Sequence, residues 1–111
     1  MEDKIRASYL YDFYGELLTD HQRQVYEMNV FEDLSLSEIA DTMGVSRQGV
    51  HDVIKRCDRL LEEYESKLKL VDKFIHIKED VARISELTSH EASADTLKQI
   101  ASISNEILEE F

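Results

Sequence analysis

Residues 35–59, SLSEIADTMGVSRQGVHDVIKRCDR, contain two helix-start signals on either side of a glycine. Ser35 stands three residues before Glu38. This is the spacing of a capping box, in which the hydroxyl accepts a backbone N–H and the glutamate side chain reaches back. Gly44 suits the left-handed residue that ends a short helix, and Ser46 suits the N-cap of the next one. The stretch therefore predicts a helix-turn-helix.

Small and apolar residues stand at the positions that this motif needs. Ala40, four residues before Gly44, allows the two helices to approach each other closely. An apolar residue follows Gly44 after six positions, as the motif requires. We expect the small core between the helices to be closed by Ile39, Val45, Val50 and Val53.

The second helix of the motif has a basic outer face. At about 100° per residue, the side opposite the apolar stripe carries groups that bind phosphates or base edges. Residues 46–59 hold four basic and two acidic side chains. A charged helix face also has the plainer interpretation of a solvated surface. The candidate nucleic-acid-binding residues are Arg47, Gln48, His51, Lys55, Arg56 and Arg59.

Composition places the whole chain in the all-α class. Its 111 residues include no proline and only three glycines, so little interrupts long helices or forms β-turns. The net charge is −11, from 13 basic and 24 acidic residues. This charge runs against the positive surface expected of a nucleic-acid-binding protein, because phosphate contacts favour basic side chains.

The sequence also indicates the cellular compartment of the protein and the kinds of chemistry to expect from it. Cys57 is the single cysteine, so an internal disulfide is excluded and a reducing compartment is favoured. The acidic start at residues 1–4 and the short apolar runs predict no signal peptide and no membrane insertion, hence a cytoplasmic protein. The four histidines lack partners at metal-binding spacing. We expect no metal, no cofactor and no enzymatic activity.

Further helices flank the motif. An aromatic-rich stripe predicts a helix over residues 4–18, and Thr19 with Gln22 forms a second capping box before a helix over residues 20–31. That helix is expected to bury Val25, Met28 and Phe31. Polar residues 88–95 indicate a connection to a last helix near 95–110. We divide the chain into a helix-turn-helix domain, 1–60, and a C-terminal helical extension, 61–111.

The fourth helix is expected to be long, because its apolar residues continue at alternating spacings of four and three. This seam consists of Val50, Ile54, Cys57, Leu61, Tyr64, Leu68, Val71 and Ile75. It extends beyond the motif and must be covered by the C-terminal helices or by the same helix of a second chain. The second alternative predicts a homodimer through Leu61, Tyr64, Leu68, Val71 and Ile75.

Two resemblances follow from these residues. Leu18-Thr19-x-x-Gln22-Arg23, Ser35-x-x-Glu38-Ile39-Ala40 and Gly44-Val45-Ser46 resemble region 4 of bacterial sigma factors, over about residues 17–60. The chain is also similar to the YlxM family of small helix-turn-helix proteins of Gram-positive bacteria and mycoplasmas, over about residues 5–75. The residues that carry this second resemblance are Tyr9-Leu10-x-Asp12-Phe13-Tyr14-x-x-Leu17-Leu18-Thr19, Ser46-Arg47-Gln48-x-Val50-x-Asp52-x-Ile54-Lys55-Arg56 and Leu61-x-x-Tyr64-Glu65-x-Lys67-Leu68.

The resemblance to the YlxM family implies a function beyond the motif itself. Genes of that family lie beside genes for the signal recognition particle protein and its receptor, which implies a part in that targeting pathway. Two hypotheses remain open. The chain is a DNA-binding regulator, or it is an interaction protein that contacts the RNA or protein of the signal recognition particle without binding DNA.

Overall fold

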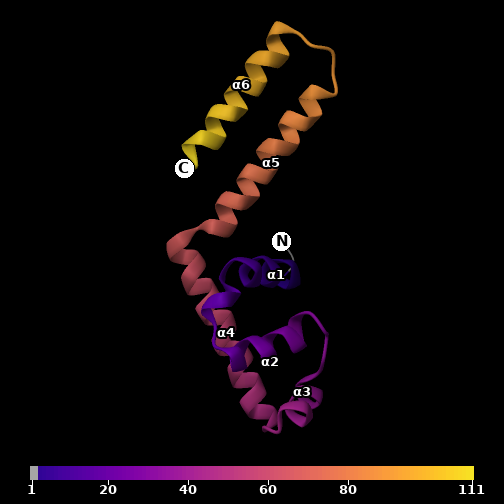
Figure 1. The fold of residues 1–111 in the computed structure, drawn as a ribbon, viewed down its shortest axis with the longest axis vertical. Coiled ribbons are helices and arrows are strands. Elements are labelled where there is room, and N and C mark those ends of the chain that lie inside the picture. The colour runs from indigo at the N-terminus through magenta and orange to yellow at the C-terminus, as the bar shows by residue number, and fades with distance from the viewer. Residues whose placement is uncertain (1–2) are drawn as a thin grey trace. The chain divides into compact units, whose positions relative to one another are not determined.

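A computed structural model describes residues 3–111, so the first two residues of the acidic start lie outside it. The described range contains six α-helices, labelled in Figure 1, and one short 3-10 turn, and no strand occurs in it. The all-α prediction is confirmed. The elements are α1 (Asp3–Tyr14), η1 (Gly15–Leu17), α2 (Asp20–Val30), α3 (Leu36–Met43), α4 (Arg47–Leu68), α5 (Leu70–Thr88) and α6 (Ala94–Glu109).

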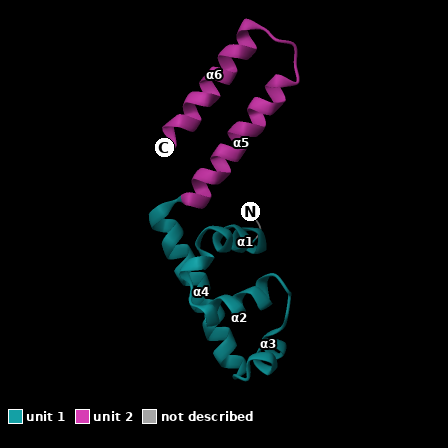
Figure 2. Cartoon of the chain, in the orientation of Figure 1, with its two compact units in different colours: residues 1–69 teal, residues 70–111 magenta. Residues whose placement is uncertain are grey.

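The chain forms two compact units, residues 1–69 and residues 70–111 (Figure 2). The division falls later in the chain than the boundary expected after residue 60, because α4 belongs entirely to the first unit. That unit contains the helix-turn-helix and the helices that cover it. The second unit is a hairpin of two antiparallel helices.

In the first unit, α1, α2 and α3 all pack against α4. Burying apolar side chains on one face of α4 is the main stabilising contribution here, since each fully buried large side chain contributes roughly 1.5–3 kcal/mol. The core of this unit consists of Leu10, Tyr14, Leu18, Val25, Tyr26, Ile39, Ala40, Val50, Cys57 and Leu61.

Two residues expected inside this core are on the surface. Val45 is 42% exposed, because it follows the left-handed Gly44 and only its backbone N–H turns inward, to the carbonyl of Ala40. Phe31 is 46% exposed and lies edge-on against the Tyr11 ring at the surface. The prediction that these two side chains are buried is therefore wrong.

The first helix is shorter than the expected range of 4–18. It ends at Tyr14 and continues as the 3-10 turn η1. Leu10 and Tyr14 are buried, whereas Ile5 and Leu17 are about half exposed, at 47% and 57%. The expected apolar stripe is thus only partly used as a core face.

The seam of the fourth helix does not continue to Ile75 on one helix. Lys69 adopts a left-handed conformation with φ 58° and ends α4, and α5 starts at the next residue. The prediction of an uninterrupted helix across this point is wrong. The cause is local, because a residue with positive φ cannot continue a right-handed helix.

The part of α4 that extends beyond the motif is covered by the chain's own N-terminal helix. Leu61 is fully buried, and the Tyr64 ring lies 6.0 Å from the Tyr14 ring at the end of α1. Neither of the two alternatives considered for this segment included α1. Of the remaining seam residues, Val71 is buried, Ile75 is partly buried and Leu68 is 48% exposed.

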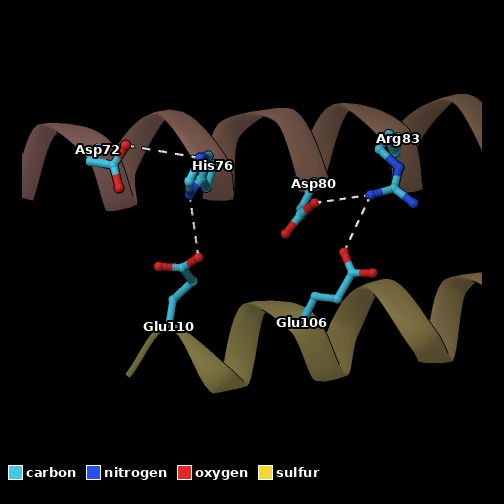
Figure 3. A network of polar contacts seen from close by, with 6 residues as sticks. All are labelled: Asp72, His76, Asp80, Arg83, Glu106 and Glu110. Atoms are coloured by element: carbon cyan, nitrogen blue, oxygen red, sulfur yellow. Dashed lines mark hydrogen bonds and ion pairs between the residues drawn. The ribbon is translucent and has the colours of Figure 1, made fainter.

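In the second unit, α5 and α6 lie side by side with opposite chain directions (Figure 1). Figure 3 shows the polar contacts that join them. The Arg83 guanidinium bridges the Asp80 and Glu106 carboxylates at 3.2 and 3.3 Å, and the His76 ring lies 3.5 Å from the Glu110 carboxylate. These contacts define which sides of α5 and α6 face each other.

Candidate nucleic-acid interface

The helix-turn-helix consists of α3, its closing turn and the first half of α4. Ser35 caps α3, with its hydroxyl accepting the Glu38 backbone N–H at 3.1 Å and the Glu38 carboxylate accepting the Ser35 N–H at 3.1 Å. Gly44 closes the helix in the left-handed region with φ 68°. The Ser46 hydroxyl then accepts the Gly49 N–H at 3.0 Å and starts α4. All three predicted signals, the capping box, the left-handed glycine and the second N-cap, are confirmed.

A small core holds α3 and α4 in fixed orientation. Ile39 of α3, Val50 of α4 and Val25 of α2 are fully buried, and Ala40 of α3 is buried beside them. Val53 packs against this cluster and is partly buried, as expected. Because α4 cannot rotate without breaking this core, the position of each residue on its outer face is determined.

Four basic side chains on that face are exposed: Arg47, Lys55, Arg56 and Arg59. Within residues 3–111, none of the four forms a hydrogen bond or an ion pair. The other three arginines of the chain do have polar partners, on Glu62, on Tyr11 and on Asp80 with Glu106. The arginines without a polar partner within residues 3–111 therefore all lie on α4, whereas the exposed lysines without one are spread over α4, α5 and α6 and the residue that ends α4: Lys55, Lys67, Lys69, Lys73, Lys78 and Lys98.

Gln48 and His51, also predicted as site residues, lie near the start of α4. The Gln48 side-chain amide donates a hydrogen bond of 3.0 Å to the Asp52 carboxylate, one turn further along. The same carboxylate lies 3.8 Å from Nδ1 of the partly exposed His51 ring. Both side chains, with Leu36 and Arg47, line a hollow on the surface. The structure thus places all six predicted residues on one stretch of α4, with Asp52 among them.

Two acidic residues further along α4 are bound to other helices of the unit. The Tyr26 hydroxyl of α2 donates a hydrogen bond of 2.9 Å to the Asp58 carboxylate. The Arg6 guanidinium of α1 holds the Glu62 carboxylate through two contacts of 2.7 Å. Arg6 and its positive charge lower the pKa of Glu62, whereas burial raises the pKa of Asp58. The positive charge of Arg6 offsets that of Glu62, whereas the neutral Tyr26 hydroxyl fixes the position of the Asp58 carboxylate.

Sequence reasoning did not identify these two interactions. Tyr26 and Asp58 are 32 residues apart, and Arg6 and Glu62 are 56 residues apart. No local spacing links such pairs, so only the packing of α1 and α2 on α4 brings them together. A search for helix periodicity could place each residue on a surface or a core face but could not match the partners.

Other kinds of site find little support in the described part of the chain. Among residues 3–111, no three or more His, Cys, Asp and Glu side chains are grouped so as to hold a metal ion. None of the helices described combines the length and the apolar character needed to cross a membrane.

Residues 1–103 match the sequence profile of the family described as "UPF0122: Putative helix-turn-helix protein, YlxM / p13 like". The chain belongs to this family. The resemblance to the YlxM family noted in the sequence is thereby confirmed.

Relatives of similar size exist in several bacilli. UPF0122 proteins of Bacillus thuringiensis (strain Al Hakam), Bacillus mycoides (strain KBAB4) and Bacillus cereus (strain AH187) are each 45% identical to the chain over 101 residues. These matches cover 90% of this chain and 92% of each relative. The UPF0122 similarity therefore extends over both structural units rather than over the helix-turn-helix alone.

Proposed function

We propose that the chain binds duplex DNA through the first half of α4 and acts as a cytoplasmic regulatory protein. The observation that carries this proposal is the set of four exposed basic side chains on α4 that have no partner within residues 3–111. A solvated helix face usually mixes its basic residues with acidic partners at a spacing of three or four. Of the acidic groups at such spacings, Asp58 and Glu62 are bound to α2 and α1, Asp52 accepts a hydrogen bond from Gln48, and Glu63 forms no ion pair within residues 3–111.

The two ends of the basic face have different parts in this proposal. In helix-turn-helix proteins, residues at the start of the second helix contact base edges in the major groove. Arg47, Gln48 and His51 occupy that place. Gln pairs with adenine and Arg with guanine, whereas basic residues further along contact phosphates. Lys55, Arg56 and Arg59 are the phosphate-binding residues.

The net charge of −11 affects how strongly the chain is expected to bind DNA. Long-range attraction to DNA is absent, so affinity depends on the local contacts of α4 and falls steeply with salt. An acidic protein of this kind binds non-specific DNA weakly, which sharpens the difference between its own site and other sequences.

A matched pair of triple variants tests the proposal. Binding of the full chain to a pool of labelled duplexes is followed by fluorescence anisotropy at low salt. Replacing Lys55, Arg56 and Arg59 with alanine is expected to abolish binding. Replacing Lys73, Lys78 and Lys98 with alanine removes the same charge outside α4 and is expected to lower affinity only slightly. Equal losses in the two variants would show that α4 is not the DNA-binding surface.

A second candidate function is contact with the protein of the signal recognition particle. It is favoured by the charge of residues 70–111, which contain nine acidic and four basic residues. An acidic surface complements a basic, RNA-binding protein. Retention of the chain on the immobilised particle protein at low salt, but not on the particle RNA, supports this candidate. No retention on either component argues against it.

A further inference from the structure

The hairpin of α5 and α6 has a small core. Its buried residues are Val71, Asp80 and Ile103, and one of these three is charged. Units of about 40 residues seldom bury enough surface to be stable without a disulfide, a metal or association with another chain. The hairpin contains no cysteine, and no metal-binding group occurs among the described residues. Association is the remaining source of burial.

Both helices of the hairpin carry an apolar seam with the spacing of a helical bundle. On α5, Ile77, Val81 and Ile84 follow each other at intervals of four and three. On α6 the intervals are four, three and four, through Leu97, Ala101, the small polar Ser104 and Leu108. This periodicity is typical of left-handed packing between helices at about 20°.

Three large apolar side chains of these seams are exposed. Val81 is 51% exposed, Leu97 is 63% exposed and Leu108 is 69% exposed. These values show that α5 and α6 do not bury their seams against each other. The sides on which they meet are the ones joined by Arg83 and Glu106 and by His76 and Glu110 (Figure 3).

Helix geometry places both seams on the same face of the hairpin. Viewed along the helix axis, the seam of α5 is rotated by about a quarter of a turn from Asp80. The seam of α6 is rotated by about a third of a turn from Ile103. Both rotations follow the sense in which residue numbers increase. Asp80 and Ile103 are the buried residues between the helices. Because the helices are antiparallel (Figure 1), rotation in the same sense along each chain brings both seams to one side.

This apolar face contains no charged residue at its seam positions. The nine acidic side chains of residues 70–111 all lie outside the seams, including those of the polar network in Figure 3. Two such faces can therefore meet without bringing carboxylates together. By contrast, a phosphate backbone finds no basic group on this face, which argues against a nucleic-acid partner there.

We propose that the apolar face, defined by Ile77, Val81, Ile84, Leu97, Ala101 and Leu108, is covered by the same face of a second copy. The product is a homodimer held by a four-helix bundle, with the acidic networks on its outside. A two-fold interface uses one self-complementary patch twice, so a single contact completes the core of both hairpins. This inference does not depend on DNA binding, although the dimer carries two α4 helices.

The proposed contact differs from the seam expected from the sequence. Leu61 of that seam is fully buried within the single chain, and Tyr64 packs against Tyr14. The apolar face proposed here instead lies entirely on α5 and α6.

Light scattering and sedimentation equilibrium on the full chain test the proposal. The variants Val81→Glu and Leu97→Glu each place a charge in the face. Ala82→Glu adds the same charge at an exposed position outside the seam and serves as the control. The unchanged chain is expected to be a dimer. Each seam variant is expected to raise the dissociation constant by on the order of 100-fold, since burying an unpaired charge is costly, and the control to change it little.

Far-UV circular dichroism separates loss of association from loss of fold. If a glutamate variant loses helix, Val81→Ala and Leu97→Ala replace it and are expected to weaken the dimer by on the order of tenfold. A chain that stays monomeric at high micromolar concentration would overturn the proposal. A dimer that neither seam variant weakens would overturn it as well, because its interface must then lie elsewhere.

Discussion

The Tyr14 hydroxyl donates a hydrogen bond of 2.5 Å to the Glu65 carboxylate, joining the last turn of α1 to the last turn of α4. Both residues are almost completely buried, with exposed fractions of 1% and 6%. A buried carboxylate is costly unless it accepts hydrogen bonds, so the pair specifies how α1 lies on α4. This contact makes the N-terminal helix part of the support behind the helix-turn-helix.

Tyr14→Phe should lower the free energy of unfolding by about 1.5–3 kcal/mol, because the buried Glu65 carboxylate loses a donor. Urea denaturation followed by circular dichroism measures the change. Tyr64→Phe is the matched control, because it makes the same change on the ring 6.0 Å away, whose hydroxyl forms no hydrogen bond among the described residues. Similar losses for both variants would contradict the role given to the Tyr14–Glu65 pair.

Replacement of Lys69 by glycine should stabilise the chain by up to about 1 kcal/mol, since glycine adopts the left-handed conformation without a Cβ penalty. Lys69 has φ 58° at the end of α4. The reciprocal change, Gly44→Ala, should destabilise by about 1 kcal/mol. No atom lies within 4 Å of the added Cβ, so backbone strain is the only cost. Denaturation curves in which both variants shift in the same direction would contradict this account.

Cys57 should resist thiol reagents in the folded chain. The side chain is fully buried, its Sγ lies 3.9 Å from the Gln22 carbonyl oxygen, and burial raises the pKa of the thiol to about 11. Since the thiolate is the reactive form, labelling in mildly alkaline buffer is expected to be slow and to become rapid in urea. Rapid labelling of the folded chain would show that this part of α4 is open to solvent.

Glu62→Gln should destabilise the chain at neutral pH and have no effect in acid. The Arg6 guanidinium lowers the pKa of the Glu62 carboxyl below 4.5. A carboxyl group whose pKa is lowered by folding stabilises the folded chain at pH values above its pKa in the unfolded chain. This stabilisation is lost as the pH falls through its pKa in the folded chain. Both side chains are 40–50% exposed, so the effect is below about 1 kcal/mol.

Thermal unfolding of Glu62→Gln across a pH series measures this difference. Glu63→Gln is the control, because the exposed Glu63 side chain forms no ion pair among the described residues. A stability difference for Glu62→Gln that persists unchanged well below pH 4.5 would contradict the assignment to Arg6.

Most of the helix-turn-helix could be predicted from the sequence because its determinants are local. The capping boxes at Thr19 and Ser35 and the left-handed Gly44 each depend on residues within four positions. Helix ends without such signals were not predictable. Lys69 ends α4 although lysine carries no preference for positive φ, and the apolar spacing continues across the break.

The candidate site was only half predictable for a related reason. Helix periodicity placed Lys55 and Arg59 on the outer face of α4. It could not show that they lack partners, because that depends on where every acidic side chain of the folded unit lies. Asp58 and Glu62 are occupied by Tyr26 and Arg6 from distant segments. The negative charge counted along the sequence is therefore larger than the negative charge that a ligand would encounter at α4.

The salt dependence of DNA binding tests the central claim most directly. Dissociation constants of the full chain for duplex DNA are measured over a salt series, for the unchanged chain, for Lys55→Ala and for Lys78→Ala, a lysine on α5. If Lys55 contacts a phosphate, its removal reduces the slope of log affinity against log salt by about one, and the α5 variant leaves it unchanged. Absent or salt-independent binding, or equal slopes for both variants, would contradict the account.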